Sequence, residues 1–315
     1  MKRQDEMNRI TQSAKRVLDI IQERVTGTTV GLFAHAPYPL ANSLRYHGDP
    51  GLFGPDSMTW PVIGDAAAFI GGIRALIVQA AHAEVVAGVS DHSRYRVDPL
   101  GRLSRTSAYV TATAYGAMPE VDEAVGIVRT MHRRVTGISH RGRPYSADTP
   151  EMAAWVHNAL TDSFLVAYEV FGPGSLTAAE ADRFVAEQAA VGALLDADPM
   201  PQTAPALAGW LEHHPDVMPS PGMDETVAFL RKPPLPLIVR FAYRLLFLAA
   251  AATITPRLRR TLGIRKVPGA ITIGRLVTWF LRWSLGSSPS WHLALLRVDA
   301  PIPEGLFRRL PPIES

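Results

Sequence analysis

Residues 119–137 read PEVDEAVGIVRTMHRRVTG and decide the fold, because they describe one amphipathic helix with clear ends. Pro119 suits the first turn of a helix, and Gly137 suits the position that follows the last turn. Apolar side chains recur at steps of three and four residues and therefore share one face: Val121, Val125, Val128, Met131 and Val135. His132 falls on the same face, which predicts an imidazole turned toward the core.

A second histidine has the same kind of setting. Residues 150–171 form another expected helix, with Pro150 in its first turn, and His157 lies on its apolar face. A core histidine satisfied by one hydrogen bond explains either residue alone. Two inward histidines in consecutive long helices strengthen the alternative, in which a ring nitrogen binds a ligand.

The rest of the chain predicts an all-α protein. It has 315 residues, of which 47% are hydrophobic and 19% charged, and no alternating β pattern of useful length. One large helical domain or two closely packed lobes fit this length. We expect an N-terminal helix in 1–30, the main domain in 31–300 and a Pro-rich tail in 301–315. A single long helix is expected over 64–87, and a Gly- and Arg-rich loop over 137–144.

Charge and cysteine content exclude several classes of protein. The net charge is only +3, with no basic stripe interleaved with aromatics, so no nucleic-acid partner is expected. The absence of cysteine excludes disulfides, iron–sulfur clusters and thiolate-ligated haem. The charged N-terminus lacks a signal core, which predicts a cytoplasmic location. Arg240 and Arg244 interrupt the apolar stretch 235–256, so we expect a buried helix, with a helix lying on a membrane surface as the alternative.

A polar stripe precedes the first histidine. Arg102, Arg105, Thr106 and Tyr109 fall on one face of an expected helix over 100–116. Two cations, a hydroxyl and a phenol would suit a carboxylate or phosphate group, and a solvated face is the bland alternative. Spacings typical of metal hydrolases, serine hydrolases and nucleotide-binding loops are absent. His213 and His214 are expected to be a stray surface pair.

This inventory is compatible with a b-type haem. Iron would take a neutral imidazole, and the propionates would take arginines or hydroxyls. The chain also resembles the catalytic domain of the MpaB and rubber-oxygenase (latex clearing protein) family over residues 40–265. The resemblance rests on an ordered set of short segments: His47-Gly-Asp-Pro, Gln79-Ala-Ala-His82, Gly88-Val-Ser-Asp-His-Ser, Arg102-Leu-Ser-Arg-Thr106, Val128-Arg-Thr-Met-His132, Tyr145-Ser-Ala-Asp148, Trp155-Val-His157, Phe171-Gly and Leu258-Arg-Arg-Thr-Leu-Gly263.

The resemblance implies an all-α haem protein with a globin-like central helix arrangement that oxidises its substrate with dioxygen. It makes His132 the axial iron ligand and Arg102, Arg105 and Thr106 the catalytic face. Arg105 stands where the family has a lysine that can bind iron, and arginine is a poor ligand. Tyr109 would join the cofactor-binding face.

Some roles implied by the resemblance stay open. His157 could be a second iron ligand, or could hydrogen-bond a propionate or bound oxygen. Glu84 and His92 are the candidates for the family's catalytic base.

The expected function is a haem b-dependent oxygenase that acts with dioxygen on a small apolar, isoprenoid-like substrate, its electron donor unspecified. Two alternatives stay open. One is a haem-binding carrier or sensor without turnover. The other is a metal-free helical module that binds peripherally to a membrane surface.

Overall fold

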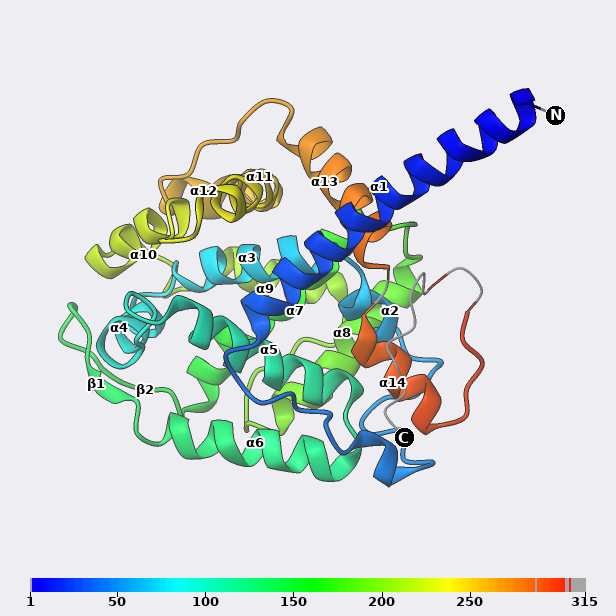
Figure 1. Cartoon of the computed structure of the whole chain (residues 1–315). Coiled ribbons are helices and arrows are strands. Elements are labelled where there is room, and N and C mark those ends of the chain that lie inside the picture. The colour runs from blue at the N-terminus through cyan, green and yellow to red at the C-terminus, as the bar shows by residue number, and fades with distance from the viewer. Residues whose placement is uncertain (1, 287, 304–305, 307–315) are drawn as a thin grey trace.

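A helical bundle surrounds two central helices in the computed structural model, which describes residues 2–286, 288–303 and 306 (Figure 1). Helices make up almost all of its regular structure, as the sequence predicts. In chain order the elements are α1 (Lys2–Phe33), the 3-10 helix η1 (Ser43–Tyr46), α2 (Thr59–Gly64), α3 (Ala68–Gln79), α4 (Ala83–His92), α5 (Pro99–Tyr115), α6 (Met118–His132), β1 (Thr136–Ile138), β2 (Pro144–Ser146), α7 (Pro150–Phe171), α8 (Ala178–Ala193), α9 (Ala204–His213), α10 (Pro221–Arg231), α11 (Leu237–Thr253), α12 (Pro256–Thr261), α13 (Ala270–Leu285) and α14 (Pro289–Arg297).

Helices α3 and α7 form the centre of the core. Gly71 lets them approach closely, because a Cβ at this position would lie 2.7 Å from the Phe164 ring. Beside this contact, Arg74 donates to Asp162 Oδ2 at 2.6 Å and to Ser163 Oγ at 2.8 Å. A buried cation is stable only when it is paired in this way. The two helices therefore have a fixed register, around which the others pack.

The remaining helices cover this pair on several sides. Helix α11 packs on α3 and on α13, and α1 packs on α13 and α5. Figure 1 shows α11, α12 and α13 together at the top of the view and α6 along its lower edge. Part of the N-terminal helix thus packs on α13 and α5, while its N-terminal end extends beyond the other helices (Figure 1). Most of the expected Pro-rich tail lies outside the described residues.

Side-chain caps explain several helix starts. Asp98 Oδ1 accepts from the Gly101 backbone N–H at 2.9 Å, and α5 begins at the next residue, Pro99. Thr177 and Glu180 form a capping box at the start of α8, as expected from their spacing. Pro150 lies in the first turn of α7. These local signals explain why the sequence predicts the limits of α5 and α7 well.

The single helix expected over 64–87 is wrong, because the helical conformation is interrupted at residues 65–67 and again at residues 80–82. Helix α3 ends at Gln79 and α4 begins at Ala83. Between them His82 is extended, forms a β-bridge with Val217, and accepts a hydrogen bond from the Val85 N–H at 3.4 Å. This partner is far away in the sequence, so the break depends on tertiary contacts.

Two other expectations need correction. The loop expected over 137–144 is confirmed at 139–143, but its two ends belong to short antiparallel strands, in which Thr136 pairs with Ser146 and Ile138 with Pro144. The sequence predicts helices over about 235–252, 256–263 and 269–285 and none after them, so α14 is an additional helix. Among the described residues, no helix combines the length and the apolar character needed to cross a bilayer.

Candidate functional site

Helices α5 and α6 carry most of the residues singled out in the sequence. Only Gly116 and Ala117 connect them, so they run antiparallel and pack together. Arg102 is in the first turn of α5, and His132 is the last residue of α6. Each residue therefore lies at the end of its own helix that is far from the connection, and no contact joins the two side chains in the described part of the chain.

His132 is half-buried rather than turned fully into the core. On α6 the expected apolar face is buried at Val121 and Val125, whereas Met131 is 54% exposed. Burial lowers the pKa of the His132 imidazole, and the nearby charge of Asp148 opposes this shift only in part. The ring is thus neutral at pH 7, and it makes no hydrogen bond within the described part of the chain. A neutral, partnerless imidazole can donate a nitrogen to a metal.

The expected stripe on α5 divides into two pairs. Arg105 and Thr106 are exposed, and Arg105 contacts Asp98 at 3.4 Å. Arg102 and Tyr109 are half-buried. The Ala and Val residues beside Tyr109 predict that the whole segment 100–116 is buried, and this prediction is wrong because Arg105 and Thr106 are exposed.

Arg102 differs from the other cations of this region in its partners. Its guanidinium lies 5.7 Å from the centre of the Tyr95 ring, and burial lowers its pKa. Within the described residues it contacts no carboxylate. A half-buried guanidinium of this kind suits an anionic group of a ligand.

A small cavity lies between α5 and α7, lined by the buried parts of Tyr109 and His157. It measures about 10 Å³ and is otherwise walled by Ile63, Val110, Thr113, Ala114, Leu160, Phe164, Gln188 and Val191. The Tyr109 hydroxyl is buried here and makes no hydrogen bond to the described residues. A cavity of this size holds one water at most. It cannot accommodate a porphyrin.

His157 has a partner in the core. Its Nε2 lies 2.6 Å from the backbone carbonyl oxygen of Gln188, to which it donates a hydrogen bond. Burial lowers the pKa of His157 to about 4. The structure does not bring it next to His132, because α6 and α7 do not pack extensively against each other. This geometry matches the structural alternative considered from the sequence, a core histidine satisfied by one hydrogen bond.

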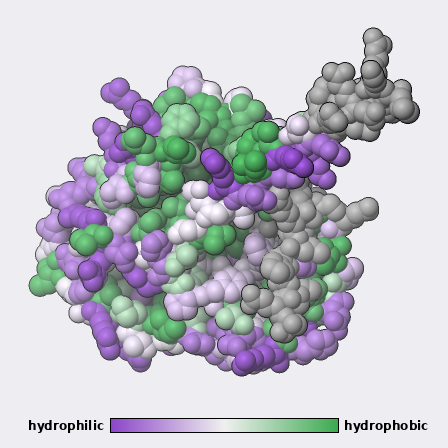
Figure 2. Space-filling model, in the orientation of Figure 1, coloured by the Kyte–Doolittle hydropathy of each residue, from purple (hydrophilic) through white to green (hydrophobic). Residues whose placement is uncertain are grey.

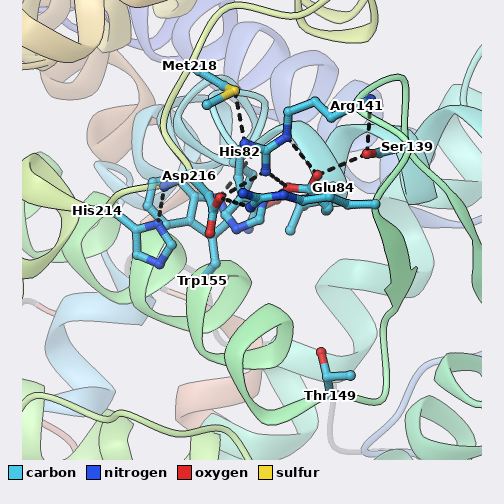
Figure 3. A network of polar contacts seen from close by, with 12 residues as sticks. His82, Glu84, Ser139, Arg141, Thr149, Trp155, His214, Asp216 and Met218 are labelled. Atoms are coloured by element: carbon cyan, nitrogen blue, oxygen red, sulfur yellow. Dashed lines mark hydrogen bonds and ion pairs between the residues drawn. The ribbon is translucent and has the colours of Figure 1, made fainter.

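The candidates for a catalytic base are both engaged elsewhere. Glu84 accepts from Ser139 Oγ at 2.9 Å and from Arg141 Nε at 2.9 Å, and a second Arg141 nitrogen contacts its other oxygen (Figure 3). Burial would raise the pKa of Glu84, but these hydrogen bonds outweigh it, and the pKa is lowered. His92 is exposed, with its Nε2 2.9 Å from the carbonyl oxygen of Thr136. Neither side chain lines the cavity between α5 and α7.

A cluster that the sequence did not predict lies beside Glu84. His82, His214 and Asp216 offer ligand atoms within 4.8 Å of one another. The rings of His82 and His214 are 5.3 Å apart, and the His214 ring lies 4.9 Å from that of Trp155. His214 is thus half-buried in an aromatic cluster and is no stray surface residue, whereas His213 is exposed.

The charges around this cluster decide its character. Asp216 Oδ1 accepts from Arg141 at 2.8 Å and from Arg143 at 2.9 Å (Figure 3). Two guanidinium groups thus balance the two carboxylates, and little negative charge is left to attract a cation. Burial, and next the charge of His214, lower the pKa of His82 to about 4. We therefore interpret the cluster as an ion-pair network that joins the β-hairpin to α4 and to the loop before α10.

Comparisons with known proteins agree with the family suggested by the sequence. The family model described as "ER-bound oxygenase mpaB/B'/Rubber oxygenase, catalytic domain" matches residues 60–283. No curated protein and no solved structure gives a significant match. The matched residues run from α2 into α13 and contain the whole α5–α6 hairpin. The chain therefore belongs to the family of the mpaB/B' and rubber-oxygenase catalytic domains.

Proposed function

We propose that this oxygenase-family protein is a haem b-dependent enzyme that acts with dioxygen on a small apolar, isoprenoid-like substrate. The observation that carries the proposal is the state of His132: a neutral, half-buried imidazole without a hydrogen-bond partner in the described part of the chain. When bound, haem would supply the iron at which dioxygen is held and activated. The membership of an oxygenase family supports this chemistry.

The side chains of α5 and α6 include the kinds of donor that a haem needs. His132 offers a neutral nitrogen to iron, and Arg102 offers a guanidinium without a carboxylate partner to a propionate. Ile127 and Met131, which are 58% and 54% exposed, offer apolar surface on the same helix. Arg105 and Thr106 are exposed one turn along α5 and can donate hydrogen bonds to polar or anionic groups of a ligand. We leave His157 and Tyr109 out of the iron site, because they line a cavity that is too small.

An absorption spectrum of the purified protein tests the haem assignment. Protein expressed with haem precursors should show a Soret band that His132→Gly removes and that added imidazole restores, because the free base can fill the vacated position. His92→Gly, at an exposed histidine, is the matched control and should leave the band unchanged. A band that persists in His132→Gly would assign the ligand to another residue.

Turnover separates an enzyme from a carrier or sensor. We expect the haem-loaded protein to consume dioxygen when squalene, an isoprenoid alkene, is supplied. Arg102→Met should lower this rate while the Soret band remains. Haem binding with stable oxygen adducts and no consumption would favour the carrier or sensor.

We also propose that the protein contacts membranes peripherally. The family includes an ER-bound oxygenase, and the apolar character of α11 suits a membrane surface. An apolar substrate would partition into such a surface, so attachment would bring the enzyme to its substrate.

A further inference from the structure

Helices α11 and α13 expose large apolar side chains on the same side of the molecule. The exposed fractions are 73% for Leu237, 86% for Ile238 and 66% for Phe241 on α11, and 62% for Leu276 and 65% for Trp279 on α13. The two helices pack side by side, and Figure 2 shows their apolar atoms gathered at the top of the view. Soluble surfaces rarely gather so many large apolar groups, which marks an interaction site.

The large apolar side chains of these helices face solvent rather than the core. Leu276, Trp279 and Phe280 are spaced by three and four residues and share one face of α13. Helix α1 packs against α13 and adds further exposed apolar groups, at Val17, Leu18, Ile20 and Ile21. We call the exposed apolar residues of α1, α11 and α13 the apolar face.

The segment that carries most of the apolar face is strongly cationic. Between Thr226 and Val298 the sequence has no Asp or Glu, and it has twelve basic residues: Arg231, Lys232, Arg240, Arg244, Arg257, Arg259, Arg260, Arg265, Lys266, Arg275, Arg282 and Arg297. The small net charge of +3 hides this segregation, because the rest of the chain is acidic. Exposed cations without an ion-pair partner in the described part include Arg240, Arg244, Arg260, Arg265 and Lys266.

The cations lie where a membrane-bound helix needs them. Arg240 and Arg244 are exposed on α11; Arg240 directly precedes the exposed Phe241, and Arg244 follows it by three residues. Arginine stems can lie along the apolar surface while their charged ends reach the lipid phosphates. Exposed tryptophan such as Trp279 is typical of the boundary between lipid headgroups and acyl chains.

We propose that the apolar face docks on an anionic lipid surface, with α11 and α13 lying in its plane. This proposal deepens the membrane contact proposed above and does not depend on the haem assignment. A second copy of the chain would also cover apolar groups, but it would bring two cationic faces together, which is unfavourable. Anionic headgroups satisfy the cations and the apolar groups at the same time.

Vesicle sedimentation of the full chain tests this proposal. We expect binding to vesicles that contain phosphatidylglycerol and weak binding to phosphatidylcholine alone, with the difference reduced at high salt. Arg240→Glu with Arg244→Glu should weaken binding by at least about tenfold, since each cation near a charged surface contributes about 1 kcal/mol. Phe241→Ser with Trp279→Ser should weaken binding by about as much through the lost apolar contact.

Matched variants on other surfaces provide the controls. Val97 is 77% exposed and lies in the loop before α5, so Val97→Ser should bind vesicles like the unmodified chain. Arg45 is exposed on η1, and Arg45→Glu should likewise bind normally. Circular dichroism should show that all variants keep their helices.

Three outcomes would overturn the proposal. The first is equal binding to neutral and anionic vesicles. The second is a loss of vesicle binding in the control variants as large as in the apolar-face variants. The third is a dimer, seen by light scattering, that dissociates in the Phe241→Ser, Trp279→Ser variant. The third outcome would mean that a second copy of the chain, and not a lipid surface, covers the apolar face. The Soret band of the same variants, measured without vesicles, reports the proposed haem site separately, so failure of one proposal is distinguishable from failure of the other.

Discussion

Arg141 is the residue on which the ion-pair network depends, since it contacts both Glu84 and Asp216. We expect Arg141→Met to lower the free energy of unfolding at pH 7 by about 3 kcal/mol, because it leaves a buried carboxylate without its partner. Arg143 contacts Asp216 as well, but its side chain is 61% exposed. Arg143→Met should therefore cost less than about 1 kcal/mol. Urea unfolding of both variants measures the difference, and similar losses would contradict it.

The same pair of variants predicts a dependence on pH. Burial alone would raise the pKa of Glu84 and of Asp216. Hydrogen bonds from Arg141 outweigh it and hold the pKa of Glu84 below its ordinary value of 4.5 and that of Asp216 below 3.8. A lowered carboxylate pKa stabilises the fold above the unfolded pKa, and this contribution is lost as the pH falls through the folded pKa. The gap in stability between the native chain and Arg141→Met should thus be widest near neutral pH and shrink below about pH 4. A gap that grows on acidification would refute this origin.

Adjacent glycines test the packing of α3 against α7. A Cβ at Gly71 would meet Phe164 at 2.7 Å and the Ser163 carbonyl oxygen at 3.1 Å, whereas one at Gly72 would meet nothing within 4 Å. We expect Gly71→Ala to destabilise by about 1–3 kcal/mol, because backbone must move. Gly72→Ala should stabilise by about 0.5–1 kcal/mol through its helix propensity. Thermal melts that rank the two variants in the reverse order would show that the helices are not packed this closely.

Elements could be predicted from the sequence where local signals define them. Asp98 and Pro150 mark the starts of α5 and α7, and both were predicted almost to the residue. The break between α3 and α4 could not be predicted, because His82 leaves the helix to pair with Val217. The predicted orientation of His132 is only partly correct, because His132 is half-buried at the end of α6. The spacing of apolar residues along the helix does not show how deeply its last turn is buried.

Across the whole molecule, family membership could be predicted from ordered motifs, whereas the clusters could not. His82, His214 and Asp216 meet only in the folded chain, and no spacing in the sequence signals them. The acid-free run over 226–298 is visible in the sequence, but the net charge conceals it. Charge must therefore be read by segment, because a surface responds to the local charges within a Debye length and not to the total.

Arg297 lies outside the residues matched to the family and ties an early loop, also outside them, to the matched α5–α6 hairpin. Its buried guanidinium in α14 donates to the Asp49 carbonyl oxygen at 2.7 Å, to Ser43 Oγ at 2.6 Å and to the Tyr115 carbonyl oxygen at 2.7 Å. Tyr115 is the last residue of α5, directly before the connection to α6. The C-terminal helix thus holds both the early loop and the hairpin that carries the candidate site.

Replacing Arg297 by methionine should weaken the whole fold and not only its end. The loss of three hydrogen bonds from a buried cation predicts a decrease of about 3 kcal/mol in the free energy of unfolding. Arg275, which is exposed on α13 and donates to the Val170 carbonyl oxygen at 3.3 Å, provides the control, and Arg275→Met should change stability by less than about 0.5 kcal/mol. Urea unfolding should show a lower midpoint with an unchanged slope, since the same surface unfolds. A separate early transition for Arg297→Met would mean instead that α14 unfolds alone, and that the hairpin does not depend on it.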